Sequence, residues 1–202
     1  MTIDRRLLAA FAAPAIALSV SACGINSVPT AEEVAKARWA DVQVNYQRRA
    51  DLIPNLVETV KGYAAQERTV LTEVTEARAK ASSIQLNADQ LNDPQAVAQF
   101  QAAQGALSSS LGRLLATVEA YPDLKSNQNF LALQSQLEGT ENRIAISLRD
   151  YNEAVRAYNT RIRTFPDMIG AKLVHGAKPM TPFEATAPNA DRAPEVNFGT
   201  TK

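Results

Sequence analysis

The chain has 202 residues and no net formal charge, with 21 basic and 21 acidic side chains, one histidine and one cysteine. The balance of charge leaves no basic surplus for nucleic acid or anionic lipid. The single histidine and the single cysteine argue against a zinc site, a disulfide framework and a cysteine nucleophile. No Gly-rich loop follows a strand-like run, and His175 has no second ligand at helical spacing. We therefore expect no cofactor, no metal and no enzymatic activity.

Residues 1–22 have the layout of an export signal, with two arginines near the start, an apolar run over residues 7–20 and two small residues at the end. The tetrad Val-Ser-Ala-Cys that ends at Cys23 resembles the lipobox of bacterial lipoproteins, in which the thiol is acylated and the chain is cut just before it. We expect Cys23 to be lipidated and to anchor the mature protein to a membrane on its extracytoplasmic side.

Two other interpretations of this leader remain open. A transmembrane anchor needs about 20 apolar residues, whereas the run over 7–20 is shorter and contains Pro14. An ordinary secretory signal would leave Cys23 as a free thiol, which is unusual in an oxidising compartment. Because Gly24 and not aspartate follows the cysteine, we favour the outer over the inner membrane if the cell is Gram-negative.

Residues 23–30 are expected to form the anchor and a short linker, and residues 31–165 a helical domain. From Trp39 to Ile84 the apolar residues recur at alternating steps of three and four, which predicts one long helix with a single buried seam. Pro54 lacks an amide hydrogen, so we expect a kink or short break there. The seam keeps its phase across Pro54, which favours a kinked helix over a loop.

Two further seams run over residues 97–121 and 144–165, and the connections between helices are short. The prediction is an all-α fold, an antiparallel up-and-down bundle of three long helices, or four if Pro54 splits the first. Residues 166–202 are expected to form an extended tail, which two apolar pairs would hold against the bundle; disorder is the alternative. These pairs are Met180 with Phe183 and Val196 with Phe198.

Polar residues interrupt the seams, and any that is buried must find a partner. One interpretation is that these residues fix the register of the helices inside the bundle. The other is that polar residues beside Pro54 form a docking site for another protein. The seam residues are Arg49, Glu67, Gln104 and Glu141, and the candidate docking residues are Arg48, Arg49, Asp51 and Asn55.

The segment from Arg48 to Tyr63, RRADLIPNLVETVKGY, resembles the signature of the LemA family. Later motifs agree with it, including the YPDLK segment at Tyr121 and the Tyr-Asn pairs at Tyr151 and Tyr158, and the resemblance runs from about residue 31 to 198. It implies a helical bundle on the outer side of a bacterial membrane, with no catalytic residues to carry over. Most members are held by an N-terminal transmembrane helix, so anchoring through a lipobox cysteine departs from the usual pattern of the family.

The function that we expect is a non-enzymatic scaffold or adaptor in the bacterial envelope that engages a membrane or envelope protein. A bundle that binds a small apolar ligand or a lipid is one alternative. A carboxylate-dependent enzyme is another, with Glu67 and Glu141 as general acid and base. Heptad seams can also be satisfied between copies, so a homo-oligomer stays open.

Overall fold

The computed structural model describes the backbone of residues 5–184 and the side chains of residues 26–184. Four long helices make up the bundle: α1 (Arg5–Lys61), α2 (Arg68–Ser83), α3 (Pro94–Val118) and α5 (Gln128–Arg161). Three short ones join or follow them: η1 (Ala88–Asn92), α4 (Pro122–Lys125) and α6 (Asp167–Leu173). The described residues contain no strand, and the prediction of an all-α bundle is confirmed.

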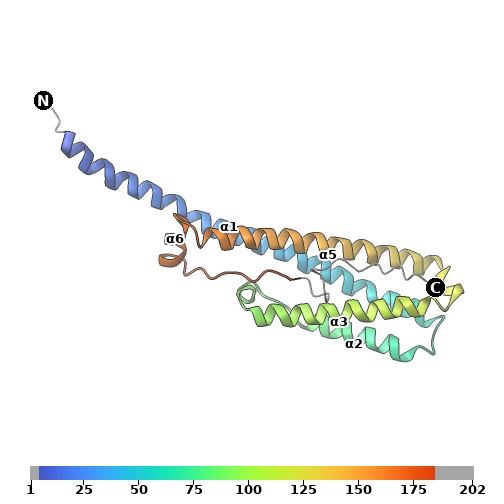
Figure 1. Cartoon of the computed structure of the whole chain (residues 1–202). Helices are drawn as coiled ribbons and strands as arrows, with labels where there is room; N and C mark the ends of the chain where they lie inside the picture. Colours follow the sequence, from blue (N-terminus) through green and yellow to red (C-terminus); the bar gives the residue numbers. More distant parts are fainter. Residues whose placement is uncertain (1–4, 185–202) are drawn as a thin grey trace, which may run out of the picture.

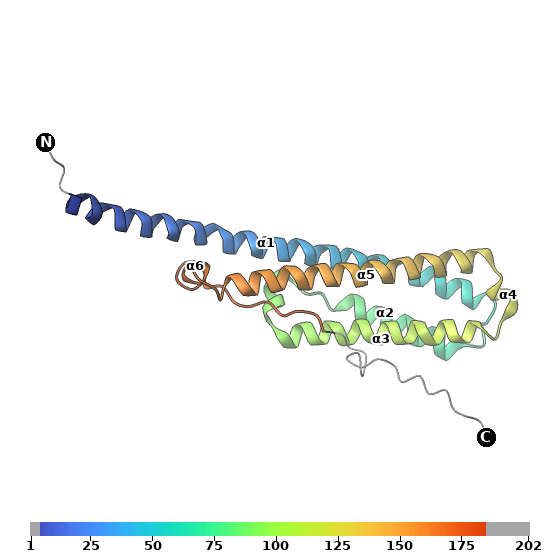
Figure 2. The same cartoon turned by 45° about the horizontal axis from the view of Figure 1, so that its top comes forward.

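The long helices alternate in direction. α1 and α5 lie side by side and antiparallel, while α2 and α3 form a second pair against them (Figures 1 and 2). The turns at α4 and between α1 and α2 lie at one end of the bundle, and α6 packs against α1 at the other. α1 continues past α6, so its first turns project from that end of the bundle (Figure 1).

The chain reverses direction after Lys61 and not at Pro54. α1 runs unbroken through Pro54, as its continuing seam indicated, and the run expected as one helix is two helices joined by residues 62–67. Ala64 is buried in this turn, where its amide donates to the carbonyl oxygen of Val60 at 2.8 Å. The heptad pattern could not reveal this reversal because the same residues face the core whether α2 extends α1 or folds back on it.

Capping residues fix where two of the helices begin. The Asp93 side chain accepts a hydrogen bond from the amide of Gln95 at 2.9 Å, and Pro94 occupies the first turn of α3. Asn127 caps α5 by accepting from the amides of Asn129 and Phe130. These caps set the two chain reversals that keep the long helices antiparallel.

Residues 23–30, expected as the anchor and a linker, are helical throughout. Residues 26–30 belong to α1, and Val28 is fully buried in the same cluster as Ala171 of α6. The packed part of the bundle therefore begins before residue 31. The side chain of Cys23 lies outside the described side chains, so its lipidation stays a prediction. None of the helices in the described part of the chain combines the length and hydropathy of a membrane-spanning segment.

The core consists of two hydrophobic clusters. One lies toward α6 and is built around aromatic rings, with Trp39 packed against Phe100, Tyr151 and Phe183 at centroid distances of 5.3 to 5.5 Å. The other lies toward α4 and is mostly aliphatic, with Ile53 and Leu107 among its members. Burial of these apolar side chains is the main stabilising contribution to a fold of this kind.

The tail was expected to be extended throughout, but it contains α6 before an extended strap of residues 178–184. A helix of this length is too short to produce a recognisable seam. Met180 and Phe183 are buried, which confirms that this pair holds the tail on the bundle. Val196 and Phe198 lie outside the described residues.

Two asparagines of α5 bind the strap through its backbone. Asn159 donates to the carbonyl oxygen of Met180 and accepts from its amide, at 2.8 and 2.9 Å. Asn152 makes the same pair of hydrogen bonds with Phe183, both at 2.8 Å. Seven residues of helix rise about 10.5 Å and three residues of extended chain span about 10 Å, so the two spacings match.

Candidate functional site: the Arg49 network and the exposed face of α1

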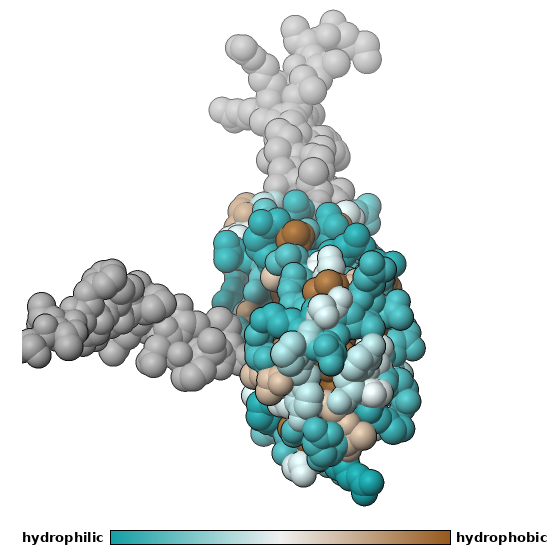
Figure 3. Space-filling view, turned by 90° about the vertical axis from the view of Figure 1, so that its right-hand side faces the viewer, coloured by the Kyte–Doolittle hydropathy of each residue, from teal (hydrophilic) through white to brown (hydrophobic). Residues whose placement is uncertain are grey.

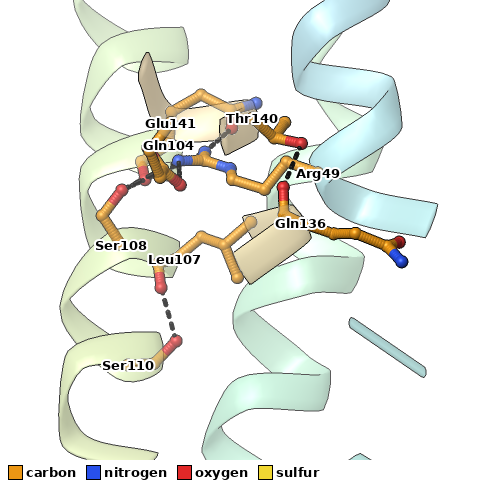
Figure 4. A network of polar contacts seen from close by, with 8 residues as sticks. All are labelled: Arg49, Gln104, Leu107, Ser108, Ser110, Gln136, Thr140 and Glu141. Atoms are coloured by element: carbon orange, nitrogen blue, oxygen red, sulfur yellow. Dashed lines mark hydrogen bonds and ion pairs between the residues drawn. The ribbon is translucent and has the colours of Figure 1, made fainter. Parts of the chain in front are cut away.

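A buried arginine lies at the centre of the bundle. The Arg49 side chain is only 2% exposed and reaches from α1 toward α3 and α5 (Figure 4). Its guanidinium donates to Ser108 Oγ at 2.9 Å, to Glu141 Oε1 at 3.0 Å and to the side-chain oxygen of Gln104. Arg49 Nε has no partner among the described residues.

Gln104 carries this network to a further helix. It is buried, and its amide nitrogen donates to the carbonyl oxygen of Ala81 on α2 at 3.2 Å. Arg49 and Gln104 thereby link all four long helices at the level where the two hydrophobic clusters meet. A buried charge is tolerated only with such partners, so the network favours one register of the helices.

Tyr46 flanks the same guanidinium. The Arg49 Cζ atom lies 5.0 Å from the centre of the Tyr46 ring, which is within range of a cation–π contact. Burial raises the pKa of Tyr46 to about 12, partly opposed by the positive charge of Arg49. The hydroxyl therefore stays protonated at physiological pH, and nothing in this arrangement activates it as a base.

Glu141 differs from the rest of the network in its exposure. Its side chain is 41% exposed, so its contact with Arg49 lies at the border between core and solvent. Glu141 is thus a partly solvated acceptor for a buried cation, which agrees with a role in fixing register.

Glu67 does not lie on a buried seam. It is in the turn before α2, where its carboxylate accepts from the Tyr121 hydroxyl at 2.7 Å, and Gln66 donates to that hydroxyl. This hydrogen bond to Glu67 raises the pKa of the Tyr121 hydroxyl. Glu141 is bonded to Arg49, which lies 12 residues before the end of α1, whereas Glu67 follows that end. Twelve helical residues rise about 18 Å, so the two glutamates lie at different heights along the bundle. They do not form a carboxylate pair.

The docking residues expected beside Pro54 divide between two faces of α1. Arg48, Asp51 and Asn55 are exposed, whereas Arg49 points into the core and is not accessible to a partner. Asp51 accepts from the Gln47 side chain at 2.7 Å. We call Arg48, Asp51 and Asn55 the α1 polar face.

A cleft opens between α1, α2 and α3. It has a volume of about 290 Å³ and is lined by Tyr46, Ile84, Phe100 and the buried Gln104, among others. Its lining mixes aromatic, aliphatic and amide groups without a carboxylate. Such a cleft can hold a small ligand but supplies no acid–base pair.

The described residues hold no cluster of three or more histidine, cysteine, aspartate or glutamate side chains that could bind a metal ion. His175 is exposed just after α6, away from Arg49. The described part of the chain therefore offers no assembled metal centre.

Sequence reasoning missed three residues that organise the bundle. Asn152 and Asn159 hold the strap, and the signal for them was present, because the two Tyr-Asn pairs are seven residues apart on one helix. Arg78 donates to the carbonyl oxygen of Ala50, and no local pattern reveals that contact because it joins two helices.

Comparison with known proteins gives one family and a small set of relatives. The model of the LemA family matches residues 38–198. Magnetosome protein MamQ 2 of Paramagnetospirillum magneticum is 29% identical over 157 residues, which cover 70% of this chain and 58% of that protein. MamQ of Magnetospirillum gryphiswaldense matches over the same shares. Protein LemA of Metamycoplasma hominis is 27% identical over 124 residues, or 61% of this chain and 52% of that protein. The chain thus spans less than two thirds of the length of these relatives.

Proposed function

The chain belongs to the LemA family, and we propose that it is a non-enzymatic, membrane-anchored scaffold that engages another protein of the bacterial envelope through the α1 polar face. The names of its relatives state no reaction. Anchoring would come from lipidated Cys23, on the extracytoplasmic side of the membrane and, in a Gram-negative cell, in the outer membrane. No cofactor is required for this function.

The observation that carries the proposal is the contrast between the two sides of α1 at one level. Inward, Arg49 is bonded to α3 and α5, and Gln104 extends the network to α2, so the backbone there is held firmly. Outward, Arg48, Asp51 and Asn55 are exposed and lie beside a shallow depression that includes Val44 and Leu52. A rigid, mixed polar and apolar surface resembles the anchor and rim of protein–protein interfaces.

A ligand-binding bundle is the second candidate, and the cleft beside Tyr46 favours it. Its volume of about 290 Å³ suits a small, partly apolar molecule. Native mass spectrometry of the detergent-solubilised full chain tests it: a retained small molecule that is lost when Ile84 is changed to Trp would support this role. The carboxylate enzyme has no comparable support, since Glu67 and Glu141 belong to separate contacts.

A crosslinking comparison in the native cells tests the scaffold. The variant replaces Arg48, Asp51 and Asn55 by alanine. The control variant replaces Glu138, Asn142 and Arg143 of α5 by alanine; these side chains are exposed and of the same chemical kinds. Glu138 accepts a hydrogen bond from Gln134, as Asp51 does from Gln47. We expect one co-purified envelope protein to be lost only in the α1 variant. Equal recovery from both variants would count against the proposal.

A further inference from the structure

Exposed apolar side chains gather at the α6 end of the bundle. Of the nine large apolar side chains that are exposed in the described residues, four lie within residues 165–174. Phe165 is 70% exposed, Ile169 44%, Leu173 81% and Val174 60%. The opposite end, at the α4 turn, presents a mostly hydrophilic surface (Figure 3). The concentration of apolar groups is therefore a property of one end of the molecule.

α6 is amphipathic in the way that a surface-lying helix requires. Gly170 and Ala171 are buried, and Ala171 belongs to the same cluster as Val28 of α1. Ile169 and Leu173 are four residues apart, which places them one turn apart on the same side of the helix. The helix is thus fixed to the bundle by one side while the other carries apolar groups that the described residues leave exposed.

Basic side chains surround these apolar groups. Arg161, Arg163, Lys172 and Lys178 are exposed, and the segment from 161 to 178 contains one acidic residue, Asp167, at 3.9 Å from Arg161. Nearby on α1, Glu32 and Glu33 are bridged to Lys36. The α6 end therefore has a basic surplus that the zero net charge of the whole chain conceals.

The same end is the one nearest the anchor. Val28, fully buried against the α6 end, follows Cys23 by five residues, a separation of about 7.5 Å as helix and at most about 17 Å as extended chain. α1 leaves the bundle here (Figures 1 and 2). A bundle attached at Cys23 cannot move its α6 end far from the bilayer.

We propose that the α6 end is a membrane-contact surface, with Phe165, Ile169, Leu173 and Val174 inserted at the interface of the bilayer and the surrounding Arg and Lys side chains at the lipid phosphates. This inference rests on the membrane anchoring in the proposed function. Shallow insertion of apolar groups with flanking basic residues is a common mode of peripheral membrane binding. It would add a second attachment to the lipid anchor and fix the orientation of the α1 polar face relative to the membrane.

An environment-sensitive label tests this surface in the lipidated full chain. Acylation blocks Cys23, so a single free thiol is introduced by Leu173→Cys or, as a control, by Leu131→Cys, which is 48% exposed near the α4 end. Each protein is labelled with NBD and reconstituted in phosphatidylcholine vesicles with or without phosphatidylglycerol. We expect spin-labelled lipid to quench the label at 173 several-fold more than the label at 131. Iodide, which quenches from the water, should quench the label at 173 several-fold less.

A charge variant and two further readouts complete the experiment. Arg163→Glu with Lys172→Glu should reduce the protection at 173 in the phosphatidylglycerol vesicles to that in phosphatidylcholine alone. Equal iodide quenching at 173 and 131 in protein that floats with the vesicles would overturn the inference and leave the anchoring intact. A disulfide-linked dimer through unlabelled Leu173→Cys would overturn it by assigning the patch to a second copy. Protein that does not float would overturn both proposals.

Discussion

The Nε–H of Arg78 on α2 donates to the carbonyl oxygen of Ala50 on α1 at 2.7 Å. That oxygen is the acceptor that an amide at position 54 would normally satisfy in a helix, and Pro54 has no amide hydrogen. A side chain from the neighbouring helix therefore satisfies the acceptor that the proline leaves unpaired, and α1 continues without a break.

Replacing Arg78 by methionine tests this relationship. The lost charged donor should reduce the free energy of unfolding by about 1.5–3 kcal/mol. In a Pro54→Ala background the amide of residue 54 can donate to Ala50, so the same replacement should cost clearly less. Urea unfolding of the four proteins, followed by circular dichroism, gives the coupling between the two sites. Equal costs in both backgrounds would show that Arg78 does not act through the acceptor left by Pro54.

The second prediction concerns the asymmetry between Arg49 and Gln104. Changing Gln104 to leucine leaves the guanidinium buried with fewer acceptors and should cost about 3–5 kcal/mol. Changing Arg49 to methionine removes the charge itself and should cost less. The double variant should be more stable than Gln104→Leu alone. Unfolding free energies that simply add would contradict a buried network that fixes register.

The third prediction concerns the strap. Asn159→Ala removes both hydrogen bonds to the backbone of Met180 and should cost about 1–3 kcal/mol locally. Hydrogen exchange at the Met180 amide should then be about 10- to 100-fold faster, since each 1.4 kcal/mol is tenfold. Asn142→Ala, at an exposed position of the same helix, is the control and should leave the exchange unchanged. Unchanged protection in Asn159→Ala would mean that the hydrogen bonds of Asn159 do not hold the strap at Met180.

The fourth prediction concerns alkaline pH. The pKa of Tyr46 is raised from 10.0 to about 12 by burial, so the folded state keeps the hydroxyl protonated while the unfolded state loses its proton near pH 10. The contribution to stability is complete below pH 10 and is lost as the pH rises through about 12. Tyr46→Phe should therefore lose less stability than the wild type between pH 10 and 12. Parallel pH profiles of the two proteins, measured by thermal unfolding, would contradict this.

The sequence predicted the helical seams and the pinning of the tail by Met180 and Phe183 because those features depend on local spacing. The position of the first chain reversal was wrong, since heptad phase is the same for a straight helix and for a hairpin closed at residues 62–67. Arg49 and Gln104 could be identified as buried polar residues, but their mutual contact could not, because it depends on how α1 and α3 are aligned. Glu67 followed the seam in the sequence and lies in a turn in the structure.

Site-specific photocrosslinking in the native cells tests the central proposal most directly. A photoreactive amino acid is placed at Asp51 or Asn55 on the α1 polar face, and at Glu138 or Asn142 as matched exposed controls on α5. The proposal predicts a discrete adduct with one envelope protein from positions 51 and 55 and none from 138 and 142. No adduct from the α1 positions in a fully expressed, membrane-attached protein, or the same adducts from both helices, would contradict it.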